Sequence, residues 1–280
     1  MYFNFPLVLS FCIEVLSSLF GVVFAFSLIL YGLQKLNKHL LVTQFGFKSL
    51  YPTAVIGTPI HELSHAILAV FFRHEVAQVK LFAPDPKTGV LGYVQHGYRN
   101  TIYQICGCFF IGIAPLLMGA AVIFLANMVF FPEVNKLFLA INEKVISGGF
   151  STLLSSFIFF EAVSIESFQG IWFALSDASF KDILWVYLII AVSVHMGPST
   201  ADLRNALPGV LALSIIIILL AVIFQSEISY RLLSIREAIG IFTKILLIAC
   251  YANLAFMGCI ILAICVKKAL TLNRSENARA

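Results

Sequence analysis

The sequence predicts an all-α polytopic membrane protein of about six transmembrane helices, with one β-hairpin inserted after the second helix. Of its 280 residues, 60% are hydrophobic and only 11% are charged, whereas roughly a quarter of a soluble globular chain is charged. Several apolar runs are long enough to cross a bilayer as helices. The net charge of +4 is scattered and forms no basic stripe with interleaved aromatic residues, so we expect no nucleic-acid partner.

Six apolar segments are the predicted membrane helices. The first has no basic start and no small-residue cleavage site, so we expect a retained helix and not a signal peptide. In the third, Gly107, Gly112 and Gly119 offer points of close helix approach, and Pro115 interrupts the hydrogen-bond ladder. The six segments are residues 5–33, 51–72, 102–131, 180–205, 207–224 and 239–266.

The connecting segments differ in character. Residues 34–48 predict a short polar loop. Residues 76–82 and 90–96 are β-leaning runs around a Pro/Asp/Gly turn, so they predict a hairpin whose free edge can accept an extended peptide. Residues 132–147 are typical of an amphipathic surface helix. We expect a single integral membrane domain over 1–280, with a core at about 51–205 and additional helices in 1–50 and 206–280.

The pattern His-Glu-x-x-His occurs at residues 61–65, inside the second apolar segment. On a helix, His61 and His65 are one turn apart on the same face, so both imidazoles can reach one metal ion. Glu62 stands beside the first histidine, where a carboxylate can take a proton from a metal-bound water. A charged residue at bilayer depth raises the free energy of membrane insertion by about 2.5–3.5 kcal/mol. Because of this cost such residues are rare, and those that occur usually have a function. We therefore predict a metal site on this helix.

A catalytic zinc usually has three protein ligands, so a third ligand is expected downstream. Glu161, Glu166 and Asp202 are the candidates at membrane depth. We take the turns at Arg73 and Pro208 as the points where the two helices leave the membrane. At about 1.5 Å per residue, His65 then lies about 12 Å and Asp202 about 9 Å below the membrane surface. These depths match only if both helices end at the same face, which requires that residues 149–177 do not fully cross. We therefore expect Asp202 to be the third ligand and residues 149–177 to be interfacial or re-entrant. Glu161 or Glu166 is the alternative third ligand.

Four segments together resemble the site-2 protease family of intramembrane zinc metalloproteases, over about residues 51–205. They are the His-Glu motif at 61–65, the hairpin ending in Gly92-Tyr93-Val94, the run Gly112-Ile113-Ala114-Pro115-Leu116, and Pro198 followed by Asp202-Leu203. Two positions depart from the family pattern. Ser64 stands where the family commonly has Gly, and Pro-Ser-Thr-Ala-Asp-Leu stands where the family has an Asn/Pro-rich Leu-Asp-Gly segment.

The resemblance implies a zinc metalloendopeptidase that cleaves membrane protein substrates, with three metal ligands, one water-activating carboxylate and a strand that aligns the substrate. These residues are His61, His65 and Asp202 for Zn²⁺, Glu62 for the water, and Tyr93, Val94 and Gln95 for the substrate. We expect a multi-pass protein in contact with the lipid bilayer of a bacterial plasma (inner) membrane.

A membrane transporter or a metal-binding scaffold that uses the same polar residues is the alternative function. Glu62 discriminates between them, because transport or structure needs ligands but no general base. His195 is interpreted either as a packed histidine near a helix end or as a direct ligand. Together with Ser199 and Thr200, it is also a candidate to orient Asp202 or to line a water path.

Three further histidines fall in predicted loops, and we expect them at the surface. They are His39, His74 and His96.

Overall fold

The computed structural model describes residues 5–130, 179–224 and 228–277, and these are mostly helical with one small antiparallel sheet. Among them, four helices are long and apolar enough to cross a membrane, or five if one bent helix pair counts as a single span. The helical architecture with an inserted hairpin is confirmed, whereas the described residues do not reach six spans. The predictions for residues 132–147 and 149–177, and for Glu161 and Glu166, lie outside the described residues.

The first candidate span is one long helical rod of 41 residues, Phe5–Phe45. The prediction of a loop at residues 34–48 is therefore wrong for residues 34–45, which are helical. The rod consists of α1 (Phe5–Leu16), a π-helical turn (Ser17–Gly21) and α2 (Val22–Phe45).

The polar residues in the last turns of α2 continue the helix because they have partners inside the protein. Asn37 is buried and donates to the backbone and side-chain oxygens of Asn253. Gln34 donates to the carbonyl of Ser193. The helix ends at Gly46, whose φ of +82° suits a residue without a side chain.

The second span carries the His-Glu motif and leads directly into the hairpin. A 3₁₀ turn (Phe47–Leu50) precedes α3 (Tyr51–Phe71). The strands β1 (Glu75–Lys80) and β2 (Tyr93–Gly97) pair antiparallel, so the predicted hairpin is confirmed.

The turn between the strands is organised by Asp85. Its carboxylate accepts hydrogen bonds from the Lys87 backbone N–H and the Thr88 hydroxyl. These bonds hold the pKa of Asp85 below its ordinary value, with the Lys87 N–H as the largest cause. A backbone bridge from Asp85 to Val90 then closes the turn.

The third predicted span is broken into α4 (Ile102–Gly112) and α5 (Ala114–Phe130), which are bent by 56°. Pro115 is the second residue of α5, where its missing N–H costs no helical hydrogen bond. The three predicted close-approach glycines are confirmed. A Cβ added at Gly107, Gly112 and Gly119 would lie 2.5–2.6 Å from atoms of Phe72, Asp202 and Met196, respectively.

The predicted span at residues 180–205 is instead two helices, α8 (Phe180–Ser193) and α9 (Thr200–Ile223), so that prediction is wrong. Pro198 disfavours the helical conformation in the residue before it, and Ser199 caps a new helix. Asp202 therefore lies in the first turn of a span and not near the end of one.

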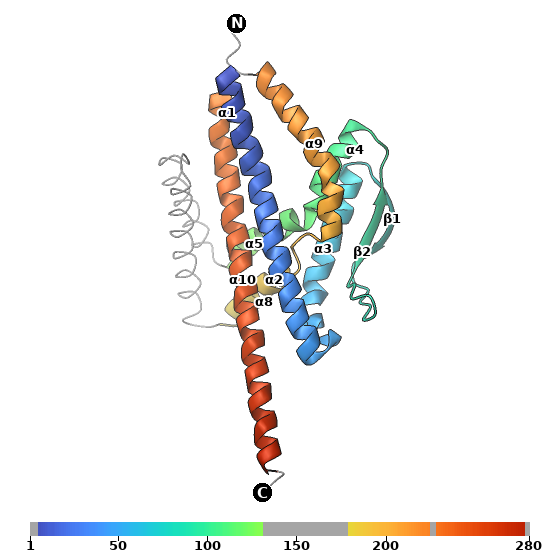
Figure 1. The fold of residues 1–280 in the computed structure, drawn as a ribbon, viewed down its shortest axis with the longest axis vertical. Helices are drawn as coiled ribbons and strands as arrows, with labels where there is room; N and C mark the ends of the chain where they lie inside the picture. The colour runs from blue at the N-terminus through green and yellow to red at the C-terminus, as the bar shows by residue number, and fades with distance from the viewer. Residues whose placement is uncertain (1–4, 131–178, 225–227, 278–280) are drawn as a thin grey trace.

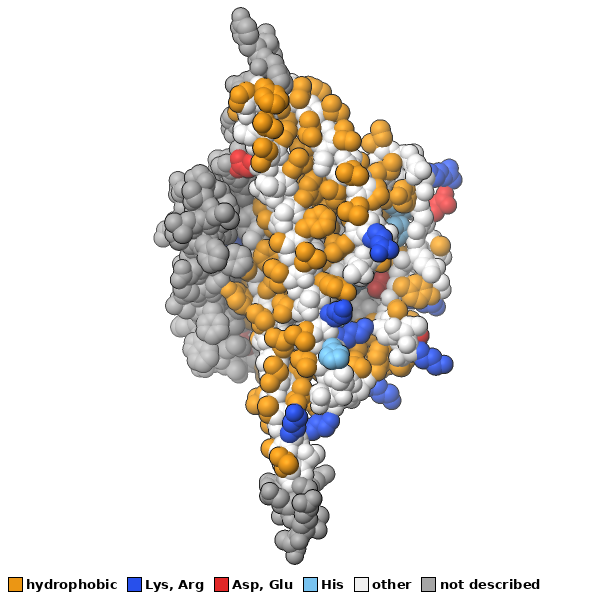
Figure 2. Space-filling model, viewed as in Figure 1, with side chains coloured by type: hydrophobic (Ala, Val, Ile, Leu, Met, Phe, Trp, Pro, Cys, Tyr) orange, Lys and Arg blue, Asp and Glu red, His pale blue; other side chains and the backbone are white. Residues whose placement is uncertain are grey.

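The last helix, α10 (Ile228–Asn277), contains the candidate span Ala238–Leu272. It runs beside α2 along the long axis of the molecule, and α9 packs against α4 (Figure 1). Hydrophobic side chains cover most of the helical face seen in Figure 2, and the charged ones lie mainly toward the hairpin. Because α3 contacts α4, α5, α8 and both strands, the His-Glu motif lies where the helices meet the hairpin.

Candidate metal centre

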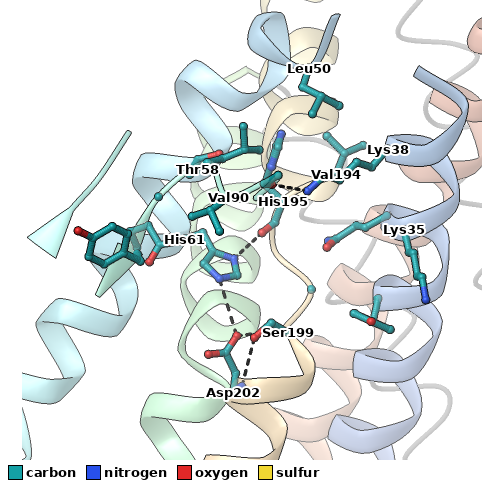
Figure 3. Close-up of a pocket in the computed structure, with 18 of the residues that line it drawn as sticks. Lys35, Lys38, Leu50, Thr58, His61, Val90, Val194, His195, Ser199 and Asp202 are labelled. Carbon is teal, nitrogen blue, oxygen red and sulfur yellow. Dashed lines mark hydrogen bonds and ion pairs between the residues drawn. The ribbon is translucent and has the colours of Figure 1, made fainter. Parts of the chain in front are cut away.

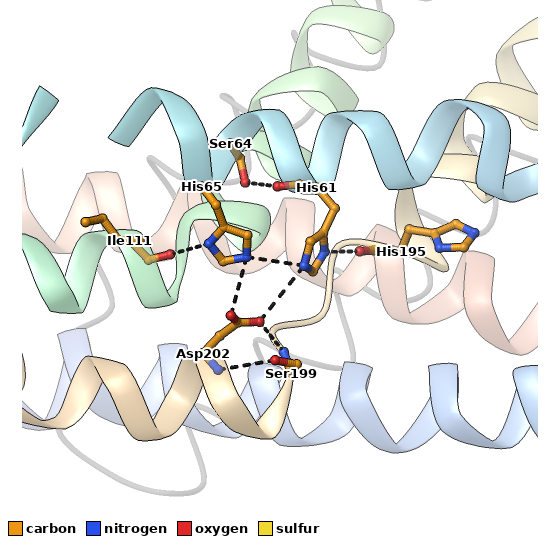
Figure 4. Close-up of polar contacts among 7 residues, drawn as sticks. All are labelled: His61, Ser64, His65, Ile111, His195, Ser199 and Asp202. Atoms are coloured by element: carbon orange, nitrogen blue, oxygen red, sulfur yellow. Dashed lines mark hydrogen bonds and ion pairs between the residues drawn. The ribbon is translucent and has the colours of Figure 1, made fainter. Parts of the chain in front are cut away.

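Three side chains from two distant segments converge on one small space (Figure 4). His61 and His65 project from α3, and Asp202 projects from α9. Asp202 Oδ1 lies 3.5 Å from His65 Nε2, and Asp202 Oδ2 lies 4.0 Å from His61 Nε2. One possible ligand atom from each residue lies within 4.8 Å of the others. The predicted ligand set is thus brought together.

Both imidazoles are oriented by backbone carbonyls behind them. His61 Nδ1 donates to the carbonyl of His195 at 2.6 Å, and His65 Nδ1 donates to the carbonyl of Ile111 at 2.9 Å. A carbonyl oxygen only accepts hydrogen bonds, so each Nδ1 carries a proton and each neutral ring has its lone pair on Nε2. This outer hydrogen bond is the arrangement usual for metal-binding histidines.

When both rings are neutral, the inward-facing atoms are therefore all acceptors. The two Nε2 atoms lie 3.3 Å apart, and the carboxylate of Asp202 faces both of them. Three lone-pair groups this close repel one another unless a positive charge lies between them. Two imidazole nitrogens and one carboxylate oxygen also match the ligands that zinc prefers at catalytic sites. These three side chains therefore offer the ligand atoms that a zinc ion needs.

Asp202 is held in place by the cap of α9. Its carboxylate accepts a hydrogen bond from the Ser199 backbone N–H at 2.7 Å, and its own N–H donates to the Ser199 hydroxyl at 3.2 Å. This reciprocal capping box leaves the second carboxylate oxygen facing His65. The expectation that Ser199 orients Asp202 is confirmed.

Small residues allow α9 to approach α4 closely enough for this arrangement. A Cβ at Gly112 would lie 2.6 Å from the carbonyl of Asp202, and one at Gly209 would lie 2.3 Å from the backbone N of Phe109. This contact seats the first turn of α9, which carries Asp202, against the end of α4, which carries the Ile111 carbonyl that orients His65.

A cavity of about 680 Å³ opens onto the three side chains. Glu62, which is 8% exposed, lines it beside them. Gly92 lies against this carboxylate side chain, because a Cβ there would come within 2.9 Å of Glu62 Cγ. The candidate base is therefore buried between the hairpin and the face of α3 that carries His61 and His65.

The far wall of the cavity is formed by α2, which is an element that the sequence did not predict there. Figure 3 shows Lys35 and Lys38 across from His61 and Asp202. The Lys38 amine donates to the Gly89 carbonyl at 2.6 Å, so it ties α2 to the end of the hairpin turn.

Of the three predicted substrate-binding residues, Tyr93 and Val94 line the cavity, whereas Gln95 is exposed and does not line it. The role of all three with a substrate stays a prediction. No described segment pairs with the outer edge of β2.

Two predictions about the remaining histidines need correction. His74 was expected at the surface but is buried, at 5% exposed, and His96 is half-buried and lines the cavity. His39 is exposed as expected, although it lies in α2 and not in a loop. His195 is packed near a helix end, where its ring nitrogen lies 3.2 Å from the Thr53 hydroxyl. Its backbone carbonyl, which residue type does not reveal, makes the contact that orients His61.

Comparisons with protein-family models, with curated proteins and with solved structures find no match for this chain. The resemblance to site-2 proteases rests on the quoted motifs.

Proposed function

We propose that this protein is a zinc metalloprotease that hydrolyses peptide bonds of membrane protein substrates within or near the bilayer. We further propose that it is a multi-pass protein of a bacterial plasma membrane. The observation that carries the first proposal is the convergence of three acceptor side chains, His61, His65 and Asp202, beside the buried carboxylate of Glu62.

Each of the four residues has a separate role in the proposed reaction. His61, His65 and Asp202 hold Zn²⁺, which when bound would lower the pKa of a water molecule to about 7 and polarise the scissile carbonyl. Glu62 takes a proton from the attacking water and returns it to the leaving amine.

The hairpin supports a role in substrate alignment. A membrane helix hides its carbonyls in hydrogen bonds, so a scissile segment must be unwound before attack. The outer edge of β2 is unpaired among the described residues and borders the cavity through Tyr93 and Val94. An extended segment added to this edge would be held beside Glu62.

The variant Glu62→Gln tests the function, because it removes the base and leaves all three proposed ligands. We expect zinc content at the wild-type level and cleavage lowered by about 10²- to 10⁴-fold. Zinc is measured by elemental analysis of the purified protein, and cleavage is measured with fluorescein-labelled casein and a transmembrane reporter peptide.

The matched control is Glu75→Gln, since Glu75 is an exposed hairpin carboxylate paired with Arg99. It should change neither quantity. Unchanged cleavage by Glu62→Gln would contradict the proposed mechanism. Retained zinc together with no cleavage by the wild-type protein would favour a transporter or a metal-binding scaffold.

A further inference from the structure

A second pair of histidines connects the base of the hairpin to the cavity. His74 precedes β1 and is buried, and His96 lies in β2 and lines the cavity. Their Nδ1 atoms lie 3.1 Å apart. The ring of His74 also stacks on Tyr98, with centroids 5.0 Å apart and an interplanar angle of 26°. The proposed protease chemistry above does not use this pair.

The inner end of the pair is fixed by Gln104 in the first turn of α4. The Gln104 carbonyl accepts a hydrogen bond from His74 Nε2 at 2.9 Å. The Gln104 side chain bonds to both ends of the hairpin, because it donates to the Arg73 carbonyl and accepts from the Arg99 backbone N–H. His74 is therefore held by a buried residue that also anchors the hairpin.

This anchor determines where the protons lie along the pair. The Gln104 carbonyl only accepts, so His74 carries a proton on Nε2 and a lone pair on Nδ1 when its ring is neutral. The facing Nδ1 of His96 must then be the donor. The second nitrogen of His96, Nε2, is left as an acceptor, and it has no hydrogen-bond partner among the described residues.

His96 belongs to the lining of the cavity that His61, His65 and Asp202 also line. Because side chains alternate along a strand, His96 shares a face of β2 with Val94, which also lines the cavity. Burial and, secondarily, the neighbouring His74 lower the pKa of His96, and His65 and Asp202 act on it more weakly. The lowered pKa favours the neutral ring, which the acceptor role requires.

We propose that His96 is a substrate-binding residue whose unprotonated Nε2 accepts a backbone N–H of an unwound peptide, and that His74 is the positioning residue that sets this tautomer. The proposal rests on the proposed function and names how the same site holds its substrate. Unwinding a membrane helix frees N–H groups that cost free energy if they stay unpaired. A neutral acceptor on β2, in the cavity that Glu62 and the three proposed ligands also line, accepts a hydrogen bond from one of these N–H groups.

The tautomers can be measured without any substrate. Full-length protein labelled with ¹⁵N-histidine in detergent micelles gives long-range ¹H–¹⁵N spectra, which are assigned by His74→Phe and His96→Gln. We expect the proton of His96 on Nδ1 and that of His74 on Nε2. His74→Phe keeps a ring against Tyr98 but removes the acceptor, so His96 should become a mixture of tautomers. A wild-type His96 protonated on Nε2 would overturn the proposal.

The binding role is measured with a dipeptidyl hydroxamate, which has a metal-binding group and backbone N–H groups, by titration calorimetry on zinc-loaded protein. Loss of one neutral hydrogen bond in His96→Leu should weaken binding about fivefold, whereas His96→Gln, which keeps an acceptor, should stay within about twofold of wild type. His39→Leu, at an exposed histidine of α2, is the control and should bind as wild type.

The two proposals fail in different ways. Equal hydroxamate affinity in His96→Leu and wild type, with full zinc content, would overturn the role of His96 and leave the metal centre intact. A wild-type protein that retains no zinc and binds no hydroxamate would contradict the proposed function, and the tautomer measurement would still decide whether His74 sets the proton on His96.

Discussion

At the residue scale, the orientation of the candidate ligands depends on atoms that side-chain identity does not report. His61 and His65 present Nε2 inward because two carbonyls, those of His195 and Ile111, accept their Nδ1 protons. Asp202 presents one oxygen to the same space because the cap of its own helix engages the other. A hydrogen bond to the second polar atom of such a side chain fixes the direction in which the first one points.

Asp202→Asn tests the third ligand. The amide keeps an oxygen that can accept the Ser199 N–H, so the cap of α9 survives, but the negative charge facing the histidines is lost. We expect zinc affinity to fall by at least about 100-fold with little change in thermal stability. Competition with a chelator of known affinity measures the first, and thermal unfolding in detergent measures the second.

The alternative third ligands provide the comparison for this experiment. Glu161→Gln and Glu166→Gln should keep wild-type zinc affinity. If one of them loses zinc and Asp202→Asn keeps it, the third ligand lies in residues 149–177.

At the scale of elements, two glycines seat neighbouring segments against α3. Gly57 allows the end of α8 and the following residues to touch α3, since a Cβ there would lie 2.2 Å from the Ala191 carbonyl and 2.5 Å from His195 Cδ2. Gly92 allows the hairpin to close over Glu62. The two contacts affect different parts of the site, and two substitutions separate them.

Gly57→Ala should displace the residues after α8 and weaken the bond from His61 Nδ1 to the His195 carbonyl. We expect zinc affinity to fall about 10- to 100-fold and unfolding free energy to fall by about 1–3 kcal/mol through overpacking. Gly32→Ala in α2, where nothing lies within 4 Å of the added Cβ, is the matched control. Equal zinc affinity in both variants would rule out this contact as an orienting device.

Gly92→Ala should displace Glu62 or the hairpin while it leaves the metal ligands untouched, because the new Cβ would meet Glu62 Cγ at 2.9 Å and the Lys80 carbonyl at 2.7 Å. We expect unchanged zinc content and cleavage reduced roughly 10- to 100-fold. Gly97→Ala on the same hairpin has open space around its Cβ and should cleave normally. Zinc loss in Gly92→Ala would show that the hairpin supports the ligands themselves.

At the scale of the whole molecule, a buried polar network joins the outer helices to the site. Asn253 of α10 is fully buried, accepts from Asn37 of α2 and donates to the Ser193 carbonyl at the end of α8. Ser193 lies two residues before His195, so this network fixes the segment that orients His61. The rod α1–α2 and α10, which flank the predicted core, therefore help to shape the cavity.

Asn253→Leu should leave the Asn37 amide and the Ser193 carbonyl without this partner. We expect unfolding free energy to fall by about 1–2 kcal/mol, measured by denaturation in detergent. Leu254→Ala, at the neighbouring exposed residue, should change stability less. A larger loss in Leu254→Ala would mean that apolar packing, and not this network, holds α10 in place.

Local patterns in the sequence were sufficient to predict several parts of this protein. Apolar length predicted the helices, turn residues predicted the hairpin, and helical spacing predicted that His61 and His65 share a face. Glycine spacing predicted the close approaches of α4 and α5. The helix, hairpin and shared-face predictions hold because each depends on interactions among residues a few positions apart. The glycines marked where another segment can approach, but not which segment does so.

Only the tertiary structure decided the rest. A polar stretch such as residues 34–45 stays helical when its side chains find partners on distant helices, as Gln34 and Asn37 do. The burial of His74 and the place of His96 in the cavity depend on where Gln104 lies. The meeting of Asp202 with the histidines depends on the helix break before Ser199 and on the approach of α9 to α4. These outcomes are set by packing between segments far apart in the chain, which no local pattern contains.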